Sequence, residues 1–199
     1  MKNNLFFLAS FLLVGNFSNV QNQEAYFDVF YKDNKIGLLY AKETMTESRS
    51  CKLLTIETNS SFLFIPIHME SEVTTIHENG ILMEGTAYRD ASRKSNDVVA
   101  TVTKIGFKRY LRERNGIKDI IRNQRITYCV VDLYFKEPLG ITKVFSNMYA
   151  QMVELKRMDD GQYQLITPDN NNSLYSYKNG KLINIEVDTP VGKVISKRI

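Results

Sequence analysis

The stretch "SLYSYKNGKLINIEVD", residues 173–188, has the pattern of a β-hairpin from one end to the other. Its centre is the Asn-Gly pair at 179–180, which tolerates the positive φ angles that a tight hairpin turn requires. In its second half, apolar Ile183, Ile185 and Val187 alternate with polar residues. A period of two is typical of a strand with one buried face. The stretch therefore predicts two antiparallel strands joined by a tight turn.

The same signal recurs along the chain. Four further turn pairs are each flanked by strand-like sequence: Asp33-Asn34, Asn79-Gly80, Asn115-Gly116 and Asp160-Gly161. Hydrophobic residues make up 43% of the chain and charged residues 24%, as in ordinary globular proteins. The sequence therefore predicts a mainly β protein, an antiparallel meander of about nine to eleven strands that forms an open barrel, a curved sheet or a sandwich.

The stretch "CVVDLYFKEPLG", residues 129–140, fits a helix and a strand almost equally well. At helical spacing its apolar side chains share one face, and at strand spacing they also alternate. Pro138 ends any helix near Lys136, and we favour the helical interpretation. The sequence therefore predicts one short helix near 125–136, packed on the sheet, with Asp132 toward solvent.

Leu133, Tyr134 and Phe135 are the expected anchors of that helix on the sheet. Together with Phe145 they are also candidates for packing or for the wall of a ligand cavity.

Residues 1–20 have the layout of a secretory signal peptide. Lys2 supplies a positive start, and the apolar run from Leu5 to Val14 is ten residues long. A membrane-spanning helix needs about 20 residues. We expect cleavage at a position within 18–23, which leaves residues 24–199 as a single domain. The protein is then exported, periplasmic or secreted, and not an integral membrane protein.

Cys51 and Cys129 are the two cysteines of the chain. In an oxidising compartment they are a candidate disulfide, provided that their Cα atoms come within about 7 Å. Two buried free thiols fit the sequence equally well, because cysteine is among the most buried residue types. Two cysteines are too few for a disulfide framework or a zinc-ribbon spacing.

The net charge of +4 is unevenly distributed. From Arg89 to Arg125 there are eleven basic and four acidic residues, whereas from Glu24 to Tyr88 there are five basic and ten acidic residues. The basic region 89–125 is a candidate contact for an anionic envelope component, such as a lipid head group or a polysaccharide. We favour the alternative of a solvated face on edge strands, where Lys and Arg discourage aggregation.

No catalytic constellation stands out in the sequence. It contains no G-x-S-x-G, G-x-G-x-x-G, G-x-x-x-x-G-K or H-E-x-x-H motif. His68 and His77 are nine residues apart, which places them on opposite faces of a regular strand. Glu70 and Glu72 share a face, but nothing indicates that they line a cleft. The sequence therefore predicts no catalytic residues, no cofactor, no metal site and no nucleic-acid partner.

Three stretches of the chain resemble a known family: "FDVFYKDNKIGLLYA" from residue 27, "LYFKEPLGITKVFSN" from residue 133 and "YQLITPDNNNSLYSYKNGKLINIEV" from residue 163. The family consists of exported bacterial proteins, chiefly from Bacteroidota, and is catalogued as domain-of-unknown-function family 6134. The resemblance covers nearly all of the mature chain and implies an exported, mainly β protein without known catalytic residues. In outline it is similar to periplasmic lipoprotein carriers, which have a curved antiparallel sheet with a helix on the concave face; this likeness concerns architecture alone.

Three functions remain open at this point. We favour the binding of a lipid or another hydrophobic or amphiphilic molecule inside the curved sheet. The alternative is a structural or interaction module of the envelope that holds no ligand. An enzyme without a recognisable motif comes third, and we predict that the protein is not an enzyme.

Overall fold

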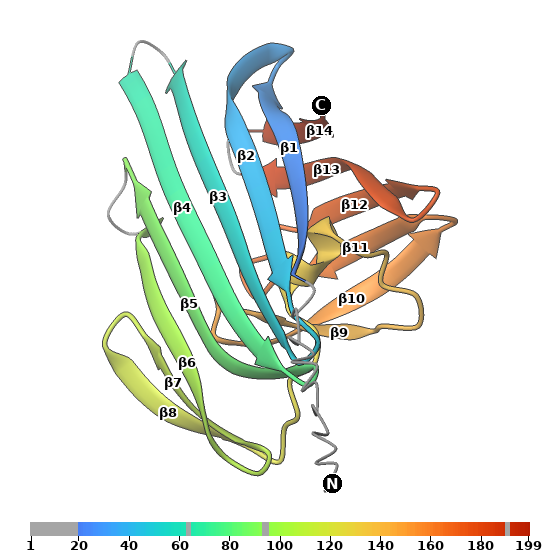
Figure 1. The fold of residues 1–199 in the computed structure, drawn as a ribbon. Helices are drawn as coiled ribbons and strands as arrows, with labels where there is room; N and C mark the ends of the chain where they lie inside the picture. Colours follow the sequence, from blue (N-terminus) through green and yellow to red (C-terminus); the bar gives the residue numbers. More distant parts are fainter. Residues whose placement is uncertain (1–19, 63–64, 93–95, 190–191) are drawn as a thin grey trace, which may run out of the picture.

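The computed structural model describes residues 20–62, 65–92, 96–189 and 192–199, and Figure 1 shows its course. The described chain forms one sheet of 14 strands, and every neighbouring pair is antiparallel. This confirms the predicted fold class. The sheet has more strands than expected, because short strands of four to six residues give little periodicity in the sequence.

The strands fall into two groups along the chain. The first group comprises β1 (Gln21–Tyr31), β2 (Asn34–Met45), β3 (Arg49–Phe62), β4 (Ile65–Glu78), β5 (Ile81–Ala91), β6 (Val98–Gly106), β7 (Arg109–Arg114) and β8 (Ile117–Arg122). The second group comprises β9 (Lys143–Ser146), β10 (Gln151–Asp159), β11 (Gln162–Ile166), β12 (Ser173–Lys178), β13 (Lys181–Thr189) and β14 (Gly192–Arg198).

The order of strands across the sheet is β8-β7-β6-β5-β4-β3-β2-β1-β14-β13-β12-β11-β10-β9. The first and last strands thus pair in the middle, and β8 and β9 are the two edges. Figure 1 shows the sheet strongly curved, with β1–β8 in blue to yellow-green and β9–β14 in orange to red. We call these halves the N-terminal wing and the C-terminal wing.

Alternation along each strand decides which side chains point into the concave side. On β1, Ala25, Phe27 and Val29 are buried at every second position. The register continues this row across the sheet, since Phe27 lies opposite Leu39 of β2. Because successive side chains of a strand point to opposite faces, one face of the whole sheet becomes apolar and forms the core.

The predicted alternation is wrong at one place on β13. The register between β12 and β13 shifts after Ser176, so that Tyr177 lies opposite Leu182. Leu182 is 1% exposed, whereas Ile183, which we expected on the buried face, is 41% exposed. A β-bulge adds one residue to a strand and exchanges the faces on its two sides.

The segment 123–142 connects the two edge strands, and we call it the strap. It runs from β8 to β9, and its residues Ile126, Cys129 and Leu133 are fully buried. It therefore lies inside the curve of the sheet, where it contacts strands of both wings.

The helix predicted near 125–136 is much shorter than expected. Among the described residues of the strap only Val130–Tyr134 is helical, as one 3-10 turn, η2. The backbone just before it is already engaged with other strands. The carbonyl of Ile126 accepts a hydrogen bond from the N–H of Leu82 at 2.9 Å, and the carbonyl of Tyr128 accepts one from Phe145 at 2.9 Å. These bonds replace the i to i+4 bonds that an α-helix needs.

The C-terminal wing also meets the N-terminal wing at the turn 147–150. The guanidinium of Arg112 donates to the carbonyl of Ala150 at 2.9 Å, and Nε of Arg114 donates to the carbonyl of Met148 at 2.8 Å. Two arginines of the basic region 89–125 therefore stabilise the contact between the wings. They do not belong to the solvated face that we expected for this region.

Residues 1–19, which carry nearly all of the predicted signal peptide, lie outside the described residues. Strand β1 begins at Gln21, within the window expected for cleavage. In the described ranges, no helix has both the length and the apolar character needed to cross a membrane.

Candidate functional site

Polar side chains interrupt the apolar inner face of the N-terminal wing. The register aligns Glu43 of β2, Lys52 of β3 and Thr75 of β4 in one row, and pairs Ser50 with His77 two residues further along. Glu43, Lys52 and His77 are only 6%, 8% and 4% exposed. Charged residues are almost never buried to this degree unless they are paired, so these side chains need partners nearby.

The strap supplies two of those partners. Cys129 precedes the 3-10 turn and Asp132 lies within it. The prediction that Asp132 faces solvent is wrong, because its carboxylate pairs with buried Lys52. The sulfur of Cys129 lies 3.7 Å from Nε2 of His77, and the backbone N–H of Cys129 donates to Oδ2 of Asp132 at 2.5 Å. We call the whole set the buried polar cluster: Glu43, Ser50, Lys52, His77, Cys129 and Asp132.

Lys52 is the electrostatic centre of the buried polar cluster. Its Nζ lies 2.9 Å from Oε1 of Glu43 and 3.0 Å from Oδ1 of Asp132, and it donates to the hydroxyl of Ser50 at 2.7 Å. Burial lowers the pKa of Lys52, but the two carboxylates outweigh it and raise that pKa above its ordinary value. The ammonium therefore stays charged, and one positive group faces two negative ones.

His77 and Cys129 are both held neutral. Burial raises the pKa of the Cys129 thiol well above its ordinary value and lowers the pKa of the His77 imidazole. Within the described part of the chain, Nδ1 of His77 has no hydrogen-bond partner. A nucleophilic cysteine needs a thiolate, and its histidine needs an orienting group. In the structure both groups are neutral, and Nδ1 of His77 lacks an orienting partner among the described residues.

The same side chains are suited to a metal ion. His77, Cys129 and Asp132 each offer one ligand atom, and these atoms lie within 4.8 Å of one another. Imidazole nitrogen, thiolate sulfur and carboxylate oxygen are the donors that Zn²⁺ takes in proteins. We did not predict a metal site, because these residues meet only when the strap folds onto β4. The available signal was the charged Glu43 and Lys52 at inward positions of otherwise apolar strand faces.

The predicted anchors of the strap are indeed buried or partly buried. Leu133 and Phe145 are 0% exposed and Tyr134 is 5% exposed, while Phe135 packs against the core from its margin. Three of these four thus lie in the centre of the protein. Other side chains of the protein pack around them.

Aromatic rings fill the space around Tyr134. Its ring meets Phe27 of β1 edge-on at a centroid distance of 6.0 Å, and Tyr175 of β12 edge-on at 6.2 Å. Perpendicular ring contacts of this kind are favourable. The row Phe27–Tyr134–Tyr175 therefore links the two wings through the strap.

The two cysteines are free thiols in the structure. Cys51 lies opposite Thr44 on the outer face of β3, one residue before inward-facing Lys52. Cys129 lies inside the curve. The sheet separates the two sulfur atoms, so the candidate disulfide is not formed.

The remaining polar candidates lie on the outer face of β4. His68 and His77 do point to opposite faces, as the register shows. Nε2 of His68 lies 3.2 Å from Oε1 of Glu70, and both side chains are about half exposed. Glu70 and Glu72 are exposed on the same face, away from the buried polar cluster.

A second feature is the end of the hairpin formed by β6 and β7. Phe107 in its turn is 84% exposed, and Ile105 beside it is 46% exposed. Around them lie four basic residues, and we call the whole set the basic tip: Lys104, Ile105, Phe107, Lys108, Arg109 and Arg122. Arg109 and Arg122 are direct cross-strand partners. Like charges in such a position destabilise a sheet, so the fold alone does not account for them.

The basic tip has little internal charge compensation. In the described ranges no salt bridge involves Lys104, Lys108, Arg109 or Arg122. Nζ of Lys108 lies 5.4 Å from the ring centroid of Phe107, a cation–π distance. The tip thus presents an exposed aromatic ring among exposed cations.

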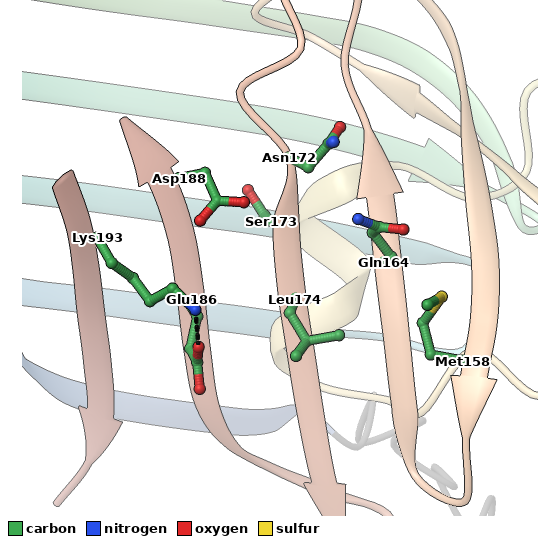
Figure 2. Close-up of a pocket in the computed structure, with 8 residues that line it drawn as sticks. All are labelled: Met158, Gln164, Asn172, Ser173, Leu174, Glu186, Asp188 and Lys193. Atoms are coloured by element: carbon green, nitrogen blue, oxygen red, sulfur yellow. Dashed lines mark hydrogen bonds and ion pairs between the residues drawn. The ribbon is translucent and has the colours of Figure 1, made fainter. Parts of the chain in front are cut away.

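Two small pockets lie in the described residues, and most of the residues that line them are polar. One, of about 170 Å³, lies on the outer face of β10–β14 (Figure 2). In Figure 2 the amine of Lys193 points to Glu186, and the two charged atoms are 2.8 Å apart. Leu174 lies opposite Glu186 on the neighbouring strand. The other, of about 300 Å³, is lined by turn residues around Gly161 and Gly180. Neither resembles the apolar cavity of a lipid-binding protein.

Comparison with known proteins places the chain in a family. No curated protein and no solved structure matches the chain. The likeness to lipoprotein carriers therefore stays a prediction. A family model does match, and its match extends over residues 27–199, from the first buried aromatic residue of β1 to the last residue of the chain. The chain belongs to the family described as Domain of unknown function (DUF6134).

Proposed function

We propose that this protein is exported and acts as a non-catalytic envelope module that docks on anionic membrane surfaces through its basic tip. The observation that carries the proposal is Phe107, an aromatic side chain that is 84% exposed at the end of a hairpin and is surrounded by cations. An exposed ring costs solubility without helping the fold. Among basic residues it has the composition of a membrane-interface anchor.

The magnitudes favour reversible docking. Each Lys or Arg close to an anionic leaflet contributes about 1 kcal/mol, and burial of a phenylalanine side chain contributes about 1.5–3 kcal/mol. Four cations and one ring therefore suffice for weak, salt-sensitive attachment. The sequence predicts an amphiphilic ligand inside the curved sheet. We propose instead that the protein binds lipids at the membrane surface.

The filled interior of the sheet supports a lipid site at the surface over a ligand inside the sheet. The row Phe27–Tyr134–Tyr175 occupies the place where a guest molecule would lie. The neutral Cys129 and His77 also support a protein without catalysis, because neither is activated. Export rests on the signal-peptide pattern of residues 1–20.

Vesicle co-sedimentation tests the proposal. We expect the protein to sediment with vesicles of phosphatidylcholine and phosphatidylglycerol, and not with phosphatidylcholine alone. Phe107→Ala and Arg122→Glu should each weaken binding, and salt should weaken it further because the attraction is electrostatic.

Two variants at the start of β8, at the other end of the strand from Arg122, serve as controls. Ile117→Ala removes an apolar side chain that is 76% exposed, and Lys118→Glu reverses an exposed charge on the same strand as Arg122. Both should bind like the unmodified protein. Failure of the unmodified protein to bind anionic vesicles overturns the proposal, and so does binding to an anionic polysaccharide such as polygalacturonate without binding to vesicles.

An internal ligand is the second candidate function. It is favoured by Ile56, Val187 and Val194, which face the concave side and are only partly buried. Native mass spectrometry of protein purified from its own compartment distinguishes the two. A stoichiometric lipid that persists in Phe107→Ala would support the internal site, whereas a bare protein mass would exclude it.

A further inference from the structure

We propose that the buried polar cluster binds one Zn²⁺ ion through His77, Cys129 and Asp132, and that this ion fastens the strap to β4. The proposal is independent of membrane docking, because the cluster lies inside the sheet and the basic tip lies on the surface. In this proposal the three residues bind a metal ion in addition to packing in the core.

The geometry of the donors fits a tetrahedral ion. Nε2 of His77 and Sγ of Cys129 are 3.7 Å apart. In a tetrahedral site with Zn–S of about 2.3 Å and Zn–N of about 2.0 Å, these two atoms are separated by about 3.5 Å. All three ligand atoms lie within 4.8 Å of one another, so side-chain adjustments of about 1 Å bring them to tetrahedral spacing.

The charges of the cluster also favour a cation. The ammonium of Lys52 faces the carboxylates of Glu43 and Asp132, which leaves one negative charge in excess inside the protein. A divalent ion bound with one thiolate adds one net positive charge and cancels that excess. Binding converts the Cys129 thiol to a thiolate and releases its proton to solvent, while the imidazole binds in its neutral form.

Asp132 keeps capacity for a further partner. Its Oδ1 meets Lys52 at 3.0 Å and its Oδ2 accepts the Cys129 N–H. A carboxylate has about four lone-pair sites, so each oxygen can still coordinate an ion. Lys52 and the backbone then act as the hydrogen-bonded surroundings that orient a metal-binding carboxylate.

Three protein ligands leave the fourth tetrahedral position to a water molecule, and the burial of the site indicates a structural role. Cys129 is 0% exposed and His77 is 4% exposed, so a substrate has no access to the ion. These two residues are 52 positions apart in the chain. A metal bond between them closes a long loop and fixes the strap against the N-terminal wing.

Cobalt substitution tests the proposal directly. The chelator-treated protein is titrated with Co²⁺, which occupies zinc sites and absorbs visibly when it is tetrahedral and bound to a thiolate. We expect one equivalent of Co²⁺ to produce a sulfur-to-cobalt charge-transfer band. One equivalent of Zn²⁺ should then abolish that band and raise the melting temperature, and Mg²⁺ should do neither.

Matched variants locate the site. Cys129→Ala should lose the charge-transfer band, and His77→Gln should weaken Co²⁺ binding by more than about tenfold. Cys51→Ala and His68→Gln change the other cysteine and the other histidine, and both should titrate like the unmodified protein. Circular dichroism confirms that each variant is folded.

The titration of the unmodified protein decides the question even if Cys129→Ala does not fold. The absence of a charge-transfer band in the unmodified protein overturns the proposal. A band that persists in folded Cys129→Ala, or one that disappears in Cys51→Ala, overturns it as well.

Discussion

The strap has two sides, and each contacts the sheet through a different kind of interaction. Toward β1 and β12 it presents Tyr134, whose ring meets Phe27 and Tyr175, and Leu133 beside it is fully buried. Toward β3 and β4 it presents Cys129 and Asp132, which meet Lys52 and His77. One five-residue turn thus joins a dry aromatic contact to a buried ionic one.

The difference between these two contacts concerns what each contributes. Apolar burial is favourable in almost any arrangement, since it depends on area and not on direction. A buried ion pair contributes little net stability, but it is costly to break because the remaining charge cannot be solvated. The aromatic side therefore supplies stability, and the ionic side fixes where the strap lies. Three substitutions test this division, from the largest expected effect to the smallest.

The largest effect should come from the ionic side. Lys52→Met leaves the carboxylates of Glu43 and Asp132 buried without a counter-charge. We expect it to lower the free energy of unfolding by about 3–5 kcal/mol, measured by urea denaturation with a chelator present.

An exposed ion pair provides the matched control. Lys193 and Glu186 are 2.8 Å apart, but their side chains are 53% and 28% exposed. Lys193→Met should cost about 0–1 kcal/mol, because water replaces the lost partner. If both methionine variants lose equally little, burial does not make the contact with Lys52 costly to break, and the ionic side of the strap does not differ from an exposed ion pair.

The aromatic side should respond to a cavity. Leu133→Ala removes a fully buried side chain from the strap, and we expect a loss of about 2–5 kcal/mol in the free energy of unfolding. Leu139→Ala changes the same residue type in the same strap, at a position that is 68% exposed. It should stay within about 0.5 kcal/mol of the unmodified protein. A near-zero effect of Leu133→Ala would show that the strap is loosely packed.

A single hydrogen bond should give the smallest effect. The hydroxyl of Tyr177 donates to the carbonyl of Leu133 at 2.6 Å in a buried environment. Tyr177→Phe keeps the ring and removes the donor, so we expect a loss of about 1–2 kcal/mol. Tyr40→Phe removes an exposed hydroxyl that donates to Glu24 at 2.9 Å, and it should be nearly neutral. Equal losses in thermal melts of the two variants would mean that burial of the Leu133 carbonyl carries no penalty.

The local pattern of the sequence was enough to predict the strands. Period-two alternation and Asn-Gly turns depend on neighbouring residues, so a hairpin such as 173–188 is visible without its partners. The same reasoning failed at Ile183, because the bulge that exposes it arises in the pairing of β12 with β13. It also overestimated the helix near 125–136, since the strap gives its backbone hydrogen bonds to other strands.

The candidate sites divide in the same way. The basic region 89–125 was visible as composition, but the pairing of Arg109 with Arg122 required the register of β7 and β8. The buried polar cluster was missed altogether. His77 and Cys129 are 52 positions apart in the chain, and a lone histidine or cysteine gives no indication of a site.

The sequence by itself determined that this protein is an antiparallel β protein and a member of its family, because alternation and turn chemistry are local properties of the chain. Only the tertiary structure decided that the interior is filled by the strap and that Cys129 and Asp132 meet Lys52 and His77. The physical reason is that these contacts join residues from distant parts of the chain, and their energies depend on burial. Burial exists only once the sheet has curved and the strap has crossed it.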